Sequence, residues 1–201
     1  MIIEPRLLLL DEPLAALDVT TRVRLRRTLA EHLRDFDGPR LLITHDPTEA
    51  FLLADEIAVL EDGIVTQRGT AEDLRIHPRT RYVADLVGSN FLVGDALDGV
   101  LSIDGHSLRV ADTGVSGSTV VSIHPRAIAL HRREPDGSPR NAWRAQVTLI
   151  EDMGERVRVD VGGPLPVTAE ITPEAADALG LCPGAEVWLS VKATEIAVEP
   201  A

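Results

Sequence analysis

The sequence has a single cysteine, Cys182, among its 201 residues. One thiol excludes an intramolecular disulfide and any zinc site that needs several cysteines. Aromatic residues make up only 3% of the chain, and 32 acidic residues against 20 basic ones give a net charge of −12. An acidic chain with few aromatics has neither the cationic surface nor the stacking side chains of a nucleic-acid binder. We therefore expect no nucleic-acid partner.

Long hydrophobic runs are missing as well. The apolar runs, of which Leu7 to Leu10 is one, have at most the length of a strand and fall far short of the roughly 18–20 apolar residues that span a bilayer. The first four residues include a glutamate and no basic cluster, so a secretory signal is not expected. These absences predict a globular protein of the cytoplasm with one or two domains.

The first half of the chain, up to about residue 87, alternates apolar runs with helical patterns. The expected elements are strands over 6–10 and 40–44, helices over 19–37 and 47–54, and a hairpin over 56–67. Both early strands are apolar throughout, which predicts that they are fully buried. The alternating order of strands and helices predicts an α/β layer with a parallel sheet.

From about residue 88 onward the sequence becomes a series of short strands separated by turn residues. The expected strands are 91–96, 100–103, 107–110, 119–123, 127–130, 144–150, 156–161, 167–171, 186–191 and 195–198. Only residues 173–179 have a helical pattern, with Thr172 as the N-cap. Many short strands at regular spacing predict a small barrel or sandwich. The expected fold class is thus α/β plus all-β, with domains over 1–87 and 88–201.

Two consecutive carboxylates, Asp11 and Glu12, follow the first apolar strand. The carboxyl ends of parallel strands are where α/β proteins bind ligands. Phosphoryl transfer uses one carboxylate to hold the magnesium shell and another group to orient the attacking water. His45 follows the second strand, so we expect it to meet the two carboxylates at the same edge. The alternative is that Asp-Glu-Pro is only a solvated turn after a core strand.

This series of motifs resembles the C-terminal half of the ATP-binding subunit of ABC transporters of the importer type. Residues 7–13 look like the Walker B strand with its catalytic glutamate, residues 14–18 like the D-loop, and residues 44–46 like the segment of the switch histidine. The resemblance extends over essentially residues 1–90. It implies an incomplete P-loop NTPase core in this half of the chain.

The resemblance also implies roles for individual residues. Asp11 would hold Mg²⁺ through water, and Glu12 would act as the general base or orient the attacking water. His45 would contact the γ-phosphate of ATP, and Asp18 would act across a dimer interface. Enzymatic activity, if present, would therefore be ATP hydrolysis.

Several of that family's motifs are missing from this sequence. The phosphate loop, Gly-x-x-x-x-Gly-Lys-Ser/Thr, has no counterpart, and the only lysine is Lys192. The glutamine loop and the signature motif are absent too, and residues 1–6 look like the stretch after the signature helix. We therefore expect a fragment, a late translational start or half of a split subunit. ATP and Mg²⁺ are expected to bind only together with the missing part, so the chain alone should not hydrolyse ATP. Loss of the strand that bears the phosphate loop should also leave apolar faces exposed.

The β-rich half resembles the molybdate-binding (Mop) form of the TOBE domain, an OB-type barrel. The resemblance rests on residues 122–128, 137–154, 165–172 and 179–196. An oxyanion site needs hydroxyl, amide and cationic donors, and the candidates are Ser138, Arg140, Asn141 and Lys192. The alternative is that residues 138–141 form a solvated turn and that Lys192 is a surface charge. Cys182 is expected to be a small buried hydrophobe.

The two resemblances together imply an ATP-hydrolysing subunit of an ABC importer for molybdate or a similar oxyanion. Its expected partners are a second ATPase subunit in a homodimer and integral-membrane permease subunits. It would act in the cytoplasm, on the inner face of the plasma membrane. The alternative function is a non-catalytic β-barrel that senses an oxyanion or mediates dimerisation.

Overall fold

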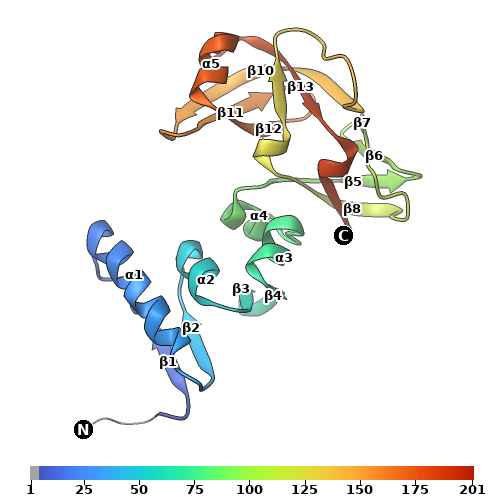
Figure 1. Cartoon of the computed structure of the whole chain (residues 1–201). Helices are drawn as coiled ribbons and strands as arrows, with labels where there is room; N and C mark the ends of the chain where they lie inside the picture. Colours follow the sequence, from blue (N-terminus) through green and yellow to red (C-terminus); the bar gives the residue numbers. More distant parts are fainter. Residues whose placement is uncertain (1–4) are drawn as a thin grey trace. The chain divides into compact units, whose positions relative to one another are not determined.

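The computed structural model describes residues 5–201; residues 1–4, on which the expectation about a secretory signal depends, lie outside the described part. The chain divides into two compact units, Met1–Glu72 and Asp73–Ala201 (Figure 1). We call these the first unit and the second unit. The expected domain boundary between residues 87 and 88 stays a prediction. Over residues 5–201, no helix is long and apolar enough to cross a membrane.

The first unit contains a parallel strand pair, two helices and a hairpin. These elements are β1 (Leu8–Asp11), α1 (Val19–Arg34), β2 (Arg40–Ile43), α2 (Pro47–Leu53), β3 (Ile57–Glu61) and β4 (Ile64–Gly69). β1 and β2 are parallel, with Leu9 opposite Leu41 and Asp11 opposite Ile43. The third strand does not join them, because β3 pairs antiparallel with β4 in a separate two-stranded sheet. The elements and the parallel pairing follow the sequence pattern, whereas a larger sheet does not form within the described residues.

The expectation that both early strands are fully buried is wrong. Along β1, Leu8 and Leu10 are half-buried while Leu9 is 60% exposed, and on β2 Leu41 is 54% exposed. The sheet has two strands in the described part of the chain, and only sheets covered on both faces bury every residue of a strand. Exposed leucines on this sheet agree with the expectation that apolar faces are left open here.

Two short helices follow the β3–β4 hairpin, and the sequence patterns did not predict either. They are α3 (Ala71–Ile76) and α4 (Arg81–Val87). Thr80 caps α4 by accepting a hydrogen bond from the Val83 N–H at 3.1 Å, and Gly88 ends it with φ at 71°. A threonine before and a glycine after the segment are the ordinary signals of a helix, so α4 was recognisable in the sequence.

The rest of the second unit consists of two five-stranded antiparallel sheets. Their strand orders are β12-β11-β10-β13-β9 and β14-β8-β5-β6-β7. The strands are β5 (Asn90–Leu97), β6 (Val100–Ile103), β7 (His106–Arg109), β8 (Gly117–Ile123), β9 (Ala129–His131), β10 (Asn141–Asp152), β11 (Val157–Gly162), β12 (Val167–Ile171), β13 (Glu186–Val191) and β14 (Ile196–Pro200). Side chains from both sheets form one apolar core, in which Val121, Val159 and Leu189 are 0% exposed.

The strand predictions for this unit are confirmed in position and differ mainly at their ends. β6, β12 and β13 have the expected bounds, and α5 (Pro173–Leu179) begins after its Thr172 cap as expected. The strand expected over 127–130 is instead a 3₁₀ turn, Pro125–Ala127, followed by β9. The expectation that Cys182 is buried is wrong, because this thiol is exposed. It lies in the turn between α5 and β13, where the chain runs along the surface.

Gly94 in β5 marks a close approach of two strands. A Cβ atom at this position would lie 2.4 Å from the carbonyl oxygen of Ser102. No side chain can occupy that space unless the backbone of β6 moves, which explains a glycine inside a strand.

Candidate functional site

Glu12 lies directly after β1 with an unusual backbone conformation. Its φ is 46°, in the left-handed region that residues other than glycine rarely adopt. The Glu12 N–H donates to the Ile43 carbonyl at 2.9 Å, and the Ala15 N–H donates to the Glu12 carbonyl at 3.2 Å. These bonds hold the strained residue in place, and such strain is concentrated at functional sites in proteins.

His45 and Glu12 are in direct contact. The Nδ1 atom of His45 lies 2.8 Å from Oε1 of Glu12, and the His45 side chain is 78% exposed. The hydrogen bond to Glu12 and the negative charge of that carboxylate raise the pKa of His45. A raised pKa favours the imidazolium, whose second nitrogen, Nε2, is then also a hydrogen-bond donor. Because β1 and β2 are parallel neighbours, the residues that follow them meet at one edge, as expected from the sequence.

Asp11 stands one residue earlier, opposite Ile43 at the last paired position of the two strands. Its side chain is exposed at the same edge of the sheet. Over residues 5–201, no cluster of three or more His, Cys, Asp or Glu residues is arranged to hold a metal ion. Magnesium in nucleotide sites is bound by one or two carboxylates plus substrate phosphates and water. Asp11 supplies one carboxylate at this edge, which fits that mode of binding.

A buried polar network behind His45 was missed in the sequence. Glu49 in α2 is only 2% exposed and accepts a hydrogen bond from the Thr44 hydroxyl at 2.9 Å. The Thr44 hydroxyl in turn accepts the Asp46 N–H at 3.1 Å. In an ordinary capping box the glutamate would take that N–H itself. Here the Thr44 hydroxyl accepts the Asp46 N–H and donates to Glu49. Thr44 and Asp46, the residues on either side of His45, are therefore held against α2.

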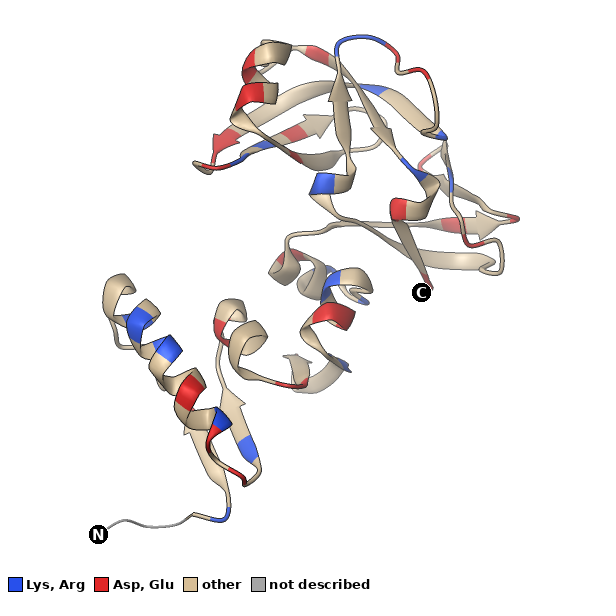
Figure 2. Ribbon diagram, in the orientation of Figure 1, with Lys and Arg blue, Asp and Glu red and all other residues tan. Residues whose placement is uncertain are grey.

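Arg26 completes this network from α1. Its Nη2 atom lies 2.9 Å from Oδ2 of Asp46 and 3.9 Å from Oε1 of Glu49. Burial raises the pKa of the Asp46 carboxyl, but the hydrogen bonds from Thr48 and the charge of Arg26 outweigh this effect and lower the pKa overall. Basic residues recur as blue bands along α1 in Figure 2, and Arg26 is the one that reaches these carboxylates. The position of His45 therefore depends on a residue in another helix.

Asp18 is the N-cap of α1. Its carboxylate accepts the Thr21 N–H at 3.1 Å, and this hydrogen bond lowers the pKa of Asp18. Arg22 donates to the Leu17 carbonyl at 3.0 Å, which ties the preceding turn to the helix. Leu14, 5% exposed, anchors the other end of that turn. The expected role of Asp18 across a dimer interface stays a prediction.

The structure separates the four oxyanion candidates into two groups. Asn141 is 3% exposed. Its Oδ1 accepts the Arg109 N–H at 2.6 Å, and its Nδ2 donates to the carbonyls of Arg109 and Val191. Both amide hydrogens are thus used inside the fold, so Asn141 ties β10 to its neighbours instead of offering a donor to an anion. The reason is that the β7 backbone passes directly beside it.

Ser138, Arg140 and Lys192 are all exposed. Asn141 lies opposite Val191 in the last pair of the antiparallel strands β10 and β13, and Arg140 and Lys192 are the residues that adjoin this pair on the two strands. Both cationic candidates thus adjoin the same end of this strand pair, and Ser138 precedes Arg140 by two residues in the loop before β10.

Comparison with known proteins identifies the relatives of this chain. Residues 137–198 match the family model of the TOBE domain. The chain is 35% identical to the molybdenum import ATP-binding protein ModC of Mycobacterium tuberculosis, over 98% of this chain and 56% of that protein. It is 33% identical to the molybdate/tungstate import ATP-binding protein WtpC of Pyrococcus abyssi, over 98% of this chain and 58% of that protein.

The relatives of this chain are thus ATP-binding proteins of importers, and the similarity extends over nearly its whole length. The Fe(3+) ions import ATP-binding protein FbpC of Escherichia coli is a further relative, with 31% identity over 81% of this chain. The chain spans little more than half the length of the curated relatives that it matches. A solved structure of the cytoplasmic molybdate-binding protein ModG aligns with 56% of it, at 20% identity and a TM-score of 0.49. A likeness at that level does not establish a shared fold.

Proposed function

We propose that this chain forms part of the ATP-hydrolysing subunit of an importer for molybdate or a similar oxyanion. The observation that carries the proposal is the 2.8 Å contact between Glu12 and His45 at the ends of two parallel strands. The comparisons support the proposal, because relatives named for molybdenum or molybdate/tungstate import align with 98% of the chain. In this proposal residues 1–87 are part of a P-loop NTPase core, and residues 88–201 are an OB-type TOBE barrel.

In this proposal each residue at the sheet edge has a separate role in phosphoryl transfer. Asp11 would hold Mg²⁺ through water, and the bound ion supplies positive charge that stabilises the transferring phosphoryl group. Glu12 would orient the attacking water and take up its proton. His45, in the protonated form that the contact with Glu12 favours, would donate from Nε2 to a γ-phosphate oxygen. The phosphate loop that cradles ATP is not in this sequence, so the chain contributes one side of the site.

The assembly follows from the same proposal. A homodimer with a second ATPase subunit would place Asp18, at the end of an exposed turn, near the nucleotide of its partner. Membrane permease subunits would bind the dimer on the cytoplasmic face of the plasma membrane.

A fusion protein tests the catalytic proposal. The chain would replace the matching part of the Mycobacterium tuberculosis relative, which supplies its own phosphate loop. We expect magnesium-dependent ATP hydrolysis by this fusion, and a loss of about 10²–10⁴-fold in the Glu12→Gln variant. The matched control is Glu56→Gln, which removes an exposed carboxylate paired with Arg68 and should leave turnover unchanged.

Two results would contradict the catalytic proposal. One is a folded fusion whose Glu12→Gln variant retains full turnover. The other is steady ATP hydrolysis by the 201-residue chain alone, because it lacks the phosphate loop. If the fusion is insoluble, the two parts can be co-expressed as separate chains and assayed together.

A second candidate function, oxyanion sensing without catalysis, is favoured by the positions of Arg140 and Lys192 beside the same end of the β10–β13 pair. Two cations and the Ser138 hydroxyl at one end of a strand pair could hold a divalent oxyanion. Titration of molybdate into the chain, followed by calorimetry, tests this. We expect saturable binding that Arg140→Ala and Lys192→Ala each weaken, while Arg133→Ala in the same loop does not. Absence of saturable binding would exclude the sensing function.

A further inference from the structure

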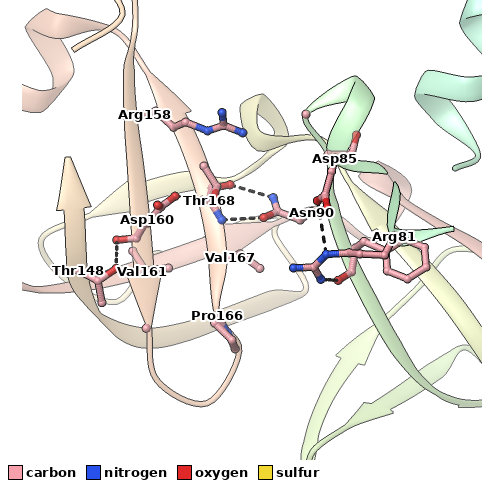
Figure 3. Close-up of a pocket in the computed structure, with 14 residues that line it drawn as sticks. Arg81, Asp85, Asn90, Thr148, Arg158, Asp160, Val161, Pro166, Val167 and Thr168 are labelled. Atoms are coloured by element: carbon pink, nitrogen blue, oxygen red, sulfur yellow. Dashed lines mark hydrogen bonds and ion pairs between the residues drawn. The ribbon is translucent and has the colours of Figure 1, made fainter. Parts of the chain in front are cut away.

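A cleft of about 500 Å³ lies within the second unit, outside every site described above (Figure 3). One side is formed by α4 and the segment that leads into β5, and the other by β10, β11 and the start of β12. A cleft of this volume is in the range of small-molecule sites.

The walls of the cleft are joined by hydrogen bonds. Asn90 at the start of β5 donates to the Thr168 carbonyl at 2.8 Å and accepts the Thr168 N–H at 2.6 Å. The Thr168 hydroxyl donates to Asp160 at 2.6 Å, and the Thr148 hydroxyl donates to the Asp160 carbonyl at 3.0 Å. These bonds hold the two walls together, so the cleft is formed in the absence of a ligand.

The two arginines of the cleft differ in how they are paired. Arg81 lies 3.4 Å from Asp85 and donates to the Phe91 carbonyl at 3.1 Å. Arg158 extends into the cleft from β11, and no dashed line reaches it in Figure 3. Its Nη2 atom lies 3.9 Å from where a Cβ of Gly88 would be. Within the described residues, Arg158 thus offers a guanidinium with no hydrogen bond or ion pair.

Ser89 gives a second, independent sign of a ligand. It lines the cleft and is only 9% exposed, yet its Oγ atom is buried without a hydrogen-bond partner among residues 5–201. Buried hydroxyls in folded proteins are nearly always hydrogen-bonded, because leaving one unpaired is costly. A bound molecule with an acceptor oxygen would satisfy it.

We propose that this cleft binds a small molecule with one carboxylate group, which pairs with Arg158 and accepts a hydrogen bond from the Ser89 hydroxyl. A guanidinium matches the two oxygens of a carboxylate in a planar, bidentate contact. Asp85 and Asp160 also line the cleft and would repel an anion of higher charge. The side chains of Phe91 and Pro166, which are not buried, supply apolar surface for the body of the ligand. The site does not depend on the proposed ATPase function.

Titration followed by NMR on the ¹⁵N-labelled full chain tests this proposal. The probes are acetate and 3-methylbutyrate, with inorganic phosphate and molybdate as competing anions, at constant ionic strength and neutral pH. We expect saturable shifts of the Ser89 and Gly88 amides with 3-methylbutyrate, at a Kd in the region of 1–10 mM. Acetate should bind more weakly because it leaves the apolar wall uncovered.

Substitutions separate the site from non-specific binding. Arg158→Gln should weaken binding by about tenfold or more, Arg158→Lys should weaken it less, and Ser89→Ala should weaken it severalfold. The control is Arg144→Gln, an exposed arginine of β10 paired with Glu186, which should bind as the unmodified chain does. The spectrum of each variant shows whether it is folded.

Three results would overturn the proposal. They are the absence of saturable shifts with either carboxylate, equal binding by a folded Arg158→Gln variant, and tighter binding of phosphate or molybdate at these same amides. The last result would assign the cleft to inorganic oxyanions instead.

Discussion

Replacing Arg26 with glutamine would remove the cation that lies between the carboxylates of Asp46 and Glu49. The three side chains are 12%, 21% and 3% exposed. Breaking a fully buried ion pair costs about 3–5 kcal/mol, and an exposed pair contributes about 0–1 kcal/mol. Because Asp46 retains some contact with water and Glu49 keeps its bond from Thr44, we expect a loss of about 2–3 kcal/mol in the unfolding free energy of the first unit. At a slope near 1 kcal/mol/M, the urea midpoint would fall by about 2–3 M.

Two spectroscopic signals separate the units in this experiment. Both tryptophans, Trp143 and Trp188, lie in the second unit, whereas most helical residues lie in α1 and α2 of the first. The far-ultraviolet circular dichroism transition should therefore shift in Arg26→Gln, and the tryptophan fluorescence transition should not. Arg27→Gln, on the exposed side of the same helix, should shift neither. Equal effects of the two substitutions on the dichroism transition would refute the role of Arg26.

Three further outcomes can be checked separately. In NMR titration, His45 should show a pKa above its ordinary value of about 6.5, and Glu12→Gln should lower the pKa of His45. The contact between His45 and Glu12 should stabilise the fold fully at a pH below 6.5. This stabilisation should be lost as the pH rises through the pKa of His45 in the folded protein. Asn141→Leu should destabilise the second unit by about 2–4 kcal/mol, because three backbone groups beside a buried side chain lose their hydrogen bonds to it. A fluorescence midpoint in urea that does not change would contradict this. Gly94→Ala should cost at least about 1–3 kcal/mol in thermal unfolding, since the new methyl group would overlap the Ser102 carbonyl, and a variant of unchanged Tm would disprove the close approach.

The sequence was most informative where a structure depends on adjacent residues. The cap at Thr172 forms as predicted, and Asp18 and Asp46 cap their helices in the same way, because a cap side chain bonds to the backbone two or three residues away. Burial of β1 could not be predicted in the same way. Whether Leu9 is covered depends on which layers pack over the sheet, and its own neighbours in the sequence do not determine that.

In the candidate site too, contacts set by the order of the strands were predictable, and contacts that depend on tertiary packing were not. The contact between Glu12 and His45 was predictable, because parallel neighbouring strands bring their carboxyl ends to one edge. Arg26 was not, since it is 20 residues from Asp46 and reaches it only through the packing of α1 against α2. For Asn141 the residue type suggested a free amide, but a strand from a distant part of the chain takes up its hydrogen bonds.

Asn90 has a mechanical consequence for the second unit. Its strand, β5, belongs to one five-stranded sheet, while its side chain is bonded to Thr168 of β12 in the other. A stretching force applied to the chain through α4 would therefore act on both sheets at Asn90, the first residue of β5. It would not separate β5 from its neighbouring strand alone. In single-molecule stretching from residue 81, we expect this unit to yield in one step and Asn90→Ala to lower the rupture force.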